Sequence, residues 1–329
     1  MVLEYRQLGS TELKVSAISL GTWAIGGSWG KVDDEESIRA IYRAIDLGVN
    51  LFDTADIYGD GRSEELLRKT TADKADEIFI ATKFCRAGDI HDPENYSEKQ
   101  VRAYCEGSLR RLGRERIDLY QIHCPPTEIL RDGSVFEVLD KLQREGKIRY
   151  YGVSVESVEQ GLIAMEYPGV RALQVIFNIF RQKLIDELFP VAKDKGVGLL
   201  ARVPLASGLL TGKFTKETRF AEDDHRNYNR DGAHFNVGET FAGLPFEKGV
   251  ELADQLRWIA EGRGTMARAA LRWILHFDAI SCAIPGFKTV AQVEENVAAV
   301  NTPPFSDEEL KRLSEFYHNE VKQYIRGPY

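Results

Sequence analysis

The chain has 329 residues, of which 43% are hydrophobic and 29% are charged, and its formal net charge is −8. This length and composition suffice for a substantial hydrophobic core, and the acidic balance argues against a general affinity for nucleic acid or anionic lipid. Charged residues interrupt the first twenty positions, and no apolar run approaches the roughly 18 residues of a membrane span, so we expect neither a signal peptide nor a membrane segment.

Strand-like and helix-like segments alternate after an opening hairpin, which we expect at Tyr5–Leu8 and Lys14–Ser16 around Gly9 and Ser10. Eight apolar runs follow, and they are near-continuous rather than alternating, as in parallel strands that are covered on both faces. These runs are Ile18–Trp23, Asn50–Ala55, Ile78–Phe84, Ile117–His123, Ile148–Ser154, Ala172–Asn178, Val197–Pro204 and Ala279–Gly286.

Helix patterns lie between the runs. Asp34–Leu47 begins in a cluster of acids and ends before Gly48, and Ser97–Leu112 opens with the capping-box pattern S-E-K-Q and ends before Gly113. The further helices expected are Ser134–Arg144, Leu184–Lys195, Thr265–Phe277, Thr289–Val300 and Ser306–Tyr324. The alternation predicts an α/β fold, a (β/α)8 TIM barrel with an N-terminal β-hairpin and an extra C-terminal helix, built as one domain over residues 1–329. A doubly wound sheet is the alternative.

One long segment departs from this alternation. Residues Gly212–Phe246 are polar and contain the stretch EDDHRNYNRDG. A loop of this length inside a compact domain is usually functional or mobile. We expect an insertion at about 212–246 after the seventh strand, followed by a helix near Glu247–Gly262, that can close over a ligand.

Four polar residues sit at or just after the ends of consecutive strand-like runs: Asp53, Tyr58, Lys83 and His123. In a parallel barrel the C-terminal strand ends meet at one catalytic face. A tyrosine titrates near ~10, and an ammonium ~4 Å away stabilises its phenolate by about 4 kcal/mol at an effective dielectric of ~20. We therefore expect Lys83 to make Tyr58 acidic, Asp53 to hold Lys83, and neutral His123 to orient a carbonyl oxygen.

Each of these residues taken alone has a structural explanation. Asp53 can cap a helix, Tyr58 can line a wall, Lys83 can pair with an acid and His123 can be a core histidine. Their occurrence together at strand ends favours catalysis. Because no serine or cysteine nucleophile fits the pattern, a cofactor must supply the nucleophile, and hydride is the natural candidate.

Other chemical signals are weaker. The glycine-rich stretch at residues 26–30 lacks the G-x-G-x-x-G spacing of a Rossmann fingerprint. The four cysteines, Cys85, Cys105, Cys124 and Cys282, are scattered without a C-x-x-C pair, and no second histidine or carboxylate lies at ligand spacing from His123 and Cys124. We therefore expect a cytosolic, reduced protein without a metal.

Two stretches suit a phosphate. Pro204–Leu209, with Lys213 beyond it, follows the seventh run, and Ile284–Thr289 follows the eighth and leads into a helix. Barrels often bind phosphate between these two loops and an adjoining helix N-terminus. Either stretch alone could be a tight turn, but the pair at one pole favours a phosphorylated cofactor.

The chain closely resembles the aldo-keto reductases over nearly its whole length, especially longer-looped bacterial members and the related potassium-channel β subunits. The motifs that carry the resemblance are FDTADIYGDGRSEELL, IATKF, DLYQIHCPP, GVS, QVIFN, PLASGLLTGK and IPGFKTVAQVEEN. The resemblance implies a (β/α)8 barrel that reduces aldehydes and ketones with an extended nicotinamide cofactor, and it matches Asp53, Tyr58, Lys83 and His123 to the catalytic tetrad.

The resemblance also implies a cofactor site that runs from the nicotinamide through the pyrophosphate to the adenosine 2′-phosphate. The residues expected there are Gly21, Thr22, Trp23, Asp53, Ser154, Gln174, Arg202, Pro204, Leu205, Ser207, Gly208, Leu209, Lys213, Gly286, Lys288, Gln292, Glu295 and Asn296. Preference for NADP (NADPH) rests mainly on Lys288.

Two positions depart from the family pattern. Val155 replaces the usual Asn after GVS, and Arg202 replaces an aromatic residue that commonly stacks on the nicotinamide. A cation there should repel the oxidised ring and so favour reduction.

We expect a cytosolic NADPH-dependent oxidoreductase that reduces small carbonyl compounds or sugars, with Trp23, Trp29 and Tyr58 in an aromatic pocket wall. Its alternatives are a cofactor-binding regulatory subunit that acts through a protein partner and a metal-dependent barrel hydrolase.

Overall fold

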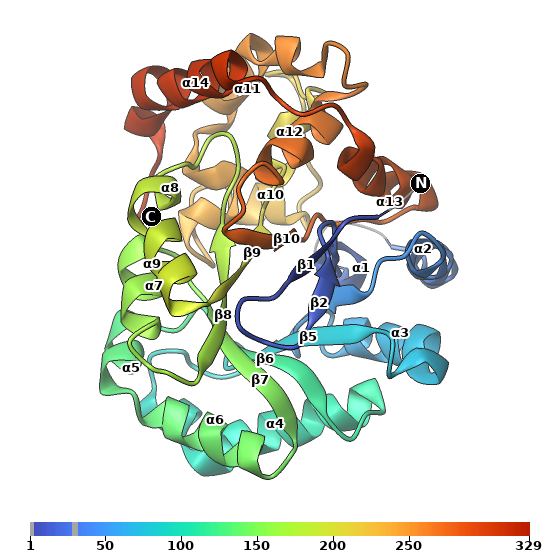
Figure 1. Ribbon diagram of the computed structural model, residues 1–329, viewed down its shortest axis with the longest axis vertical. Coiled ribbons are helices and arrows are strands. Elements are labelled where there is room, and N and C mark those ends of the chain that lie inside the picture. Colours follow the sequence, from blue (N-terminus) through green and yellow to red (C-terminus); the bar gives the residue numbers. More distant parts are fainter. Residues whose placement is uncertain (1–2, 28–31) are drawn as a thin grey trace.

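The structure is a computed structural model that describes residues 3–27 and 32–329. Eight parallel strands lie in the order β10-β9-β8-β7-β6-β5-β4-β3 and helices surround them (Figure 1). The strands are β3 (Leu20–Gly21), β4 (Leu51–Asp53), β5 (Phe79–Phe84), β6 (Ile117–His123), β7 (Ile148–Ser154), β8 (Val170–Ile176), β9 (Gly198–Arg202) and β10 (Ile280–Ala283). Parallel bridges from Ile18 to Ala283 and from Gly21 to Gly286 join the two ends of the sheet. The predicted TIM barrel is confirmed, and the doubly wound alternative is wrong.

The predicted hairpin is also confirmed, and it covers the N-terminal end of the barrel. Strands β1 (Tyr5–Gln7) and β2 (Lys14–Ser16) pair antiparallel. Leu8 and Val15 pack into one buried cluster with Leu51 and Leu119, which begin or lie early in their strands. The turn residue Gly9 has φ +53° and lies against the backbone of Gly198, where a side chain would overlap the chain.

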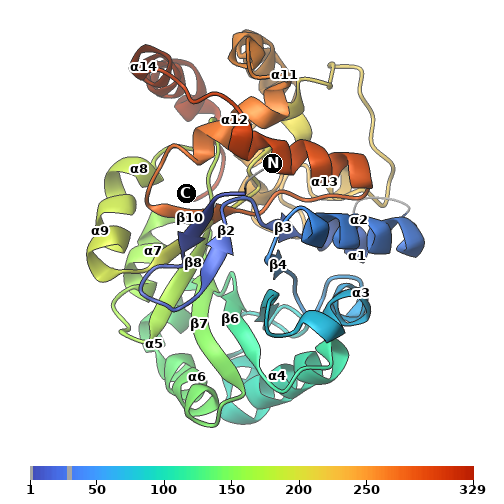
Figure 2. The same cartoon turned by 45° about the vertical axis from the view of Figure 1, so that its right-hand side comes forward.

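The helices follow the predicted order with several changes of length. They are α1 (Trp23–Gly26), α2 (Asp34–Asp46), α3 (Arg62–Thr71), α4 (Glu98–Leu112), α5 (Thr127–Asp132), α6 (Ser134–Arg144), α7 (Val158–Ala164), α8 (Leu184–Glu187), α9 (Phe189–Lys195), α10 (His225–Tyr228), α11 (Phe246–Gln255), α12 (Met266–Ile274), α13 (Val290–Val297) and α14 (Asp307–Phe316). Both views show the helices ringing the barrel, with α11 and α14 together at one side (Figure 2). None of the helices in the described part of the chain has the length and apolar character needed to span a bilayer.

Three expected elements differ from what the sequence patterns indicate. The single helix expected over 184–195 is two short helices, because Pro190 lies in the first turn of α9 and a proline ring fits there but not in a helix interior. The C-terminal helix begins at a capping box formed by Ser306 and Glu309, but it ends at Phe316 and continues as a wider turn, Tyr317–Val321. Trp23, expected to end a strand, begins α1.

The insertion after β9 packs onto the barrel, although its composition indicates an exposed loop. Asn229 is fully buried because its side chain donates to Thr240 Oγ1 at 2.9 Å and accepts from the backbone N–H groups of His234 and Phe235 at 3.0 and 2.8 Å. Satisfied polar groups can be buried at little cost. The helix expected near 247–262 is α11, which is shorter, followed by a tight turn at Arg257–Ala260.

Candidate active site

The four residues predicted to act together lie together at the C-terminal end of the barrel. Lys83 Nζ lies 2.7 Å from Asp53 Oδ2 and 3.3 Å from the Tyr58 hydroxyl oxygen, and Lys83 is fully buried. The Tyr58 and His123 rings meet edge to face with centroids 5.9 Å apart. The strands supply this arrangement, because Asp53 ends β4, Lys83 lies near the end of β5 and His123 ends β6.

Asp53 is held on both carboxylate oxygens. Oδ2 accepts from Lys83, and Oδ1 accepts from Gln174 Nε2 at 2.7 Å and from Gln121 Nε2 at 3.3 Å. Lys83 also donates to the Thr54 carbonyl oxygen at 2.7 Å. A buried ion pair keeps its charges only when its remaining hydrogen-bonding groups are satisfied, as they are here.

The electrostatics correct one expectation. Burial raises the pKa of Tyr58 above its usual value of 10.0, and the opposing field of Lys83 does not overcome it. The pKa of Lys83, which burial alone would lower, is raised by Asp53 and Tyr58. Tyr58 is therefore a protonated phenol beside a charged ammonium. Lys83 lowers the pKa of Tyr58 as predicted, but burial outweighs this effect, so the predicted net acidification is wrong. A protonated phenol is nevertheless the form that donates a proton.

His123 is neutral, as expected. Burial lowers its pKa well below 6.5, and the charges of Arg86, Lys83 and Arg202 lower it further. A neutral imidazole can donate one hydrogen bond to a carbonyl oxygen without competing with Tyr58 for the proton transfer.

Three further side chains, Trp23, Phe235 and Arg86, surround the space in front of Tyr58 and His123. Trp23 stacks near Tyr58 with centroids 6.1 Å apart, and Phe235 from the insertion lies edge to face with Trp23 at 6.4 Å. The guanidinium of Arg86 lies 5.1 Å from the centre of the Phe235 aromatic ring. Arg86 Nε donates to the His123 carbonyl oxygen at 3.2 Å, so contacts connect these side chains around the space. Trp29, the other expected wall residue, lies outside the described residues.

These side chains line one end of a cavity of about 410 Å³. Thirteen of the residues expected at the cofactor line the same cavity: Gly21, Trp23, Asp53, Gln174, Arg202, Pro204, Leu205, Ser207, Gly208, Lys213, Gly286, Lys288 and Gln292. The other five, Thr22, Ser154, Leu209, Glu295 and Asn296, are not among its lining residues. Glu295, expected at the adenosine end, pairs with Arg268 at 2.7 Å.

The backbone after β9 is shaped for an anion. Val203, Ala206, Ser207 and Gly208 have φ of 51°, 48°, 55° and 103°, so four residues of this turn are left-handed, a conformation that is costly for the three that are not glycine. Such conformations form concavities of N–H groups that bind anions. The N-terminus of α13, capped by Thr289, lies behind Lys288 at the same end of the cavity. These features fit a dinucleotide whose pyrophosphate and adenosine phosphate lie at this end.

Two cations at this end differ in their surroundings. Partial burial lowers the pKa of Lys288 from its usual 10.5, and an anion beside the ammonium would oppose that effect. Arg226, on α10 of the insertion, also lines the cavity and pairs with Asp224 at 2.6 Å. Sequence reasoning missed Arg226, because nothing in EDDHRNYNRDG distinguishes a residue that faces the cavity from one that faces solvent.

A buried charged cluster beside His123 was also missed. Glu239 from the insertion pairs with Arg86 at 2.9 Å and with Arg202 at 3.6 Å, and Glu156 pairs with Arg86 at 3.2 Å. Arg202, expected to present a bare cation to the nicotinamide, therefore has an acidic partner in Glu239, which it shares with Arg86. The expected repulsion between Arg202 and an oxidised nicotinamide stays a prediction.

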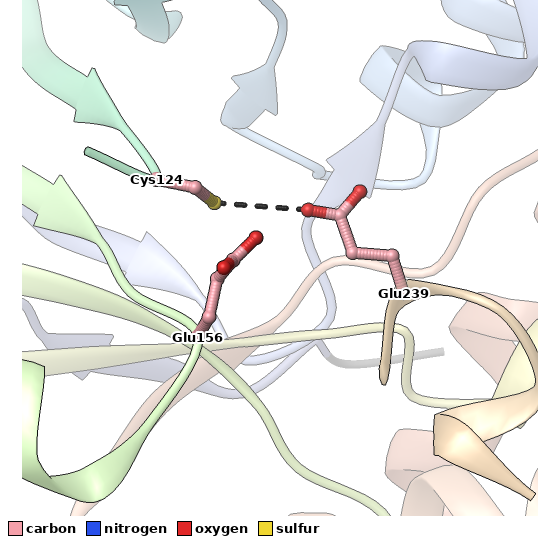
Figure 3. A group of neighbouring side chains, drawn as sticks. All are labelled: Cys124, Glu156 and Glu239. Atoms are coloured by element: carbon pink, nitrogen blue, oxygen red, sulfur yellow. Dashed lines mark hydrogen bonds between the residues drawn. The ribbon is translucent and has the colours of Figure 1, made fainter. Parts of the chain in front are cut away.

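Cys124 joins Glu156 and Glu239 in a group whose potential ligand atoms all lie within 4.8 Å of one another (Figure 3). The sequence showed no carboxylate near Cys124, because Glu239 comes from the distant insertion. Both carboxylates already bind guanidinium groups, and burial raises the pKa of the Cys124 thiol. The donor set fits an arginine-paired cluster better than a cation site.

The model of the Aldo/keto reductase family matches residues 17–318 of the chain. The chain belongs to this family of oxidoreductases. It is 32% identical to aldo-keto reductase YhdN of Bacillus subtilis, covering 99% of this chain and 97% of the relative. It is 29% identical to a probable voltage-gated potassium channel subunit beta of Arabidopsis thaliana, with 92% of each chain covered.

Solved structures of family members share the fold. The glycerol dehydrogenase of Gluconobacter oxydans is 34% identical with a TM-score of 0.76, over 100% of this chain and 99% of that one. An aldo-keto reductase from Klebsiella pneumoniae, solved in complex with NADPH, has a TM-score of 0.71 at 24% identity, with 99% of this chain and 100% of that one covered. The predicted family is confirmed.

Proposed function

We propose that the protein reduces aldehydes and ketones to alcohols with NADPH as hydride donor. The observation that carries the proposal is Lys83 Nζ, buried between Asp53 at 2.7 Å and the Tyr58 hydroxyl at 3.3 Å, at one end of a cavity whose other end suits phosphate. The NADPH complex of the Klebsiella relative supports the choice of cofactor.

The cofactor-binding residues divide along the cavity. Lys288, Gln292 and the loop after β9 would hold the phosphates, and Gln174 with Gly21 would hold the nicotinamide end. Bound in this way, NADPH supplies a hydride to the carbonyl carbon.

The protein's own groups handle the oxygen. His123 donates a hydrogen bond that orients the carbonyl oxygen, and the Tyr58 O–H bond breaks as its proton passes to that oxygen. The resulting phenolate is stabilised by Lys83, whose charge is fixed by Asp53. Water regenerates the phenol after the alcohol leaves. Trp23 and Phe235 limit water around the reacting atoms.

The test is NADPH consumption with short aldehydes by the wild type and by Tyr58→Phe. The variant keeps the ring and its contact with Trp23 but loses the proton donor. We expect turnover to fall by about 10²–10⁴ with NADPH affinity unchanged. Near-normal turnover of the variant would assign the proton to another group. A wild type that binds NADPH but consumes none would indicate a cofactor-binding regulatory subunit, like the channel subunit it resembles.

A further inference from the structure

We propose that Arg86 and Glu239 form a recognition pair for a substrate hydroxyl group, so that the protein selects neutral hydroxy-carbonyl compounds over plain alkyl and anionic ones. The inference deepens the proposed carbonyl reduction and rests on it. Neither residue belongs to the tetrad or to the expected cofactor site, yet both line the cavity.

The position of Arg86 places the pair on the substrate side. Arg86 follows β5, which lies across the barrel from β9, and the phosphate loops follow β9 and β10. Arg86 Nε is bonded to the carbonyl of His123 at 3.2 Å, so the guanidinium adjoins the residue that orients the reacting oxygen. Glu239 reaches the same place from the insertion, where it is only 4% exposed.

The hydrogen bonds of the pair leave a donor on Arg86 Nη1 and an acceptor on Glu239 Oε2 with spare hydrogen-bonding capacity. A guanidinium carries five N–H donors, and the described residues accept four of those on Arg86. One edge is tight, with Nη2 to Glu239 Oε1 at 2.9 Å, whereas Nη1 to Glu239 Oε2 is long at 3.5 Å. The remaining donor is on Nη1, and Oε2 has that long contact alone among the described residues.

A donor and an acceptor side by side match a hydroxyl group. A hydroxyl can accept from Arg86 Nη1 and donate to Glu239 Oε2 at once. An alkyl group would leave the remaining Nη1 donor unpaired and Oε2 with only its long contact, and a carboxylate or phosphate would face Oε2 with acceptors alone. The pair therefore favours a hydroxyl group over an alkyl group and also over an anionic group.

The charge balance of the cluster also disfavours anionic substrates. Arg86 and Arg202 are balanced by Glu156 and Glu239, all within one set of ion pairs. Although burial opposes it, the pull of Arg86 and Arg202 lowers the pKa of Glu239 to about 2, so this carboxylate stays ionised. An anionic substrate would therefore gain no net attraction from Arg86. Trp23 and Phe235 complete the wall with apolar surface.

The experiment compares glyceraldehyde with propanal, which has the same carbon chain without hydroxyls, and with the anion glyoxylate, at saturating NADPH. The wild type should favour glyceraldehyde over propanal in kcat/KM by about tenfold or more. Arg86→Met should reduce that ratio about tenfold, because the hydroxyl loses its donor, and the ratio is the readout whatever the variant does to the turnover of propanal. Arg131→Met, at an exposed arginine paired with Glu159, is the matched control and should leave the ratio unchanged.

A second variant tests the charge argument independently. Glu239→Gln keeps the shape but leaves the cluster with one excess positive charge, so glyoxylate should gain about tenfold relative to propanal. Turnover of both aldehydes with an unchanged ratio in Arg86→Met, or no gain for glyoxylate in Glu239→Gln, would overturn the inference while leaving carbonyl reduction intact. No turnover of either aldehyde by the wild type would overturn the proposed function and the inference together.

Discussion

Asp56 is a buried acid beside the active site whose charge should make stability depend on pH. It lies two residues before Tyr58 and is 7% exposed. Burial raises the pKa of its carboxyl from 3.8 to about 7, the charge of Glu64 adds to the rise, and Arg111 and Lys83 oppose it only in part. The folded protein therefore holds a proton on Asp56 at pH values where the unfolded chain has lost it.

The sign and size of the effect follow from linkage. Between pH 3.8 and about pH 7 the unfolded state binds fewer protons than the folded state, so the free energy of unfolding falls as pH rises. Each unit of pKa difference corresponds to about 1.4 kcal/mol, so the loss reaches roughly 4 kcal/mol at and above about pH 7. Asp56→Asn carries no such charge and removes this loss.

Urea denaturation of the wild type and of Asp56→Asn at about pH 5 and about pH 8 measures the difference. From about pH 5 to about pH 8, the free energy of unfolding of the wild type should fall by about 3 kcal/mol more than that of the variant. A constant difference in stability between the two proteins does not affect this comparison. Asp60→Asn, exposed in the same loop, is the control and should show no comparable gain. Parallel pH dependence of Asp56→Asn and the wild type would refute the assignment of a raised pKa to Asp56.

Three further outcomes follow from the same geometry. Burial lowers the pKa of His123 and raises that of Tyr58, so the pH profile of kcat/KM for reduction should show no inflection at the usual histidine pKa near ~6.5. An inflection there that persists in Asp56→Asn would assign His123 a charged role. Lys288→Ala should raise the Kd of NADPH much more than that of NADH, measured by fluorescence titration, and equal increases would show that Lys288 does not contact the 2′-phosphate. Gly9→Ala should lower the unfolding free energy by roughly 1–3 kcal/mol, because φ is +53° and the backbone of Gly198 blocks the side chain. Gly146→Ala, with φ +76° and open space around it, should cost less in the same denaturation assay.

The convergence of the four central residues could be predicted because the information is local. Asp53, Lys83 and His123 each end, or nearly end, an apolar run, and the parallel barrel brings strand ends together. The direction of the Tyr58 pKa could not be predicted in this way. It depends on how completely the phenol is buried, and the apolar runs contain no measure of that burial.

The charged cluster was beyond sequence reasoning for a different reason. Arg86 lies just after β5 and could have been noticed by its position, but Glu239 lies in a polar insertion with no strand to anchor it. Composition describes that insertion as exposed, whereas hydrogen bonds between Asn229, Thr240 and the backbone allow it to be buried. Contacts made through such long-range burial leave no periodic pattern in the sequence.

The carboxylate that the insertion contributes bears on the expected preference for reduction. A bare Arg202 beside the nicotinamide would disfavour the oxidised, positively charged cofactor and so bias the protein toward reduction. Glu239 lies 3.6 Å from Arg202 and stays ionised because the two arginines lower its pKa. With this partner, we expect Arg202 to bias the protein toward reduction less than a bare cation would. Since removing Glu239 restores the bare cation, Glu239→Gln should weaken NADP⁺ binding relative to NADPH, and equal changes in the two affinities would show that Arg202 does not act on the nicotinamide.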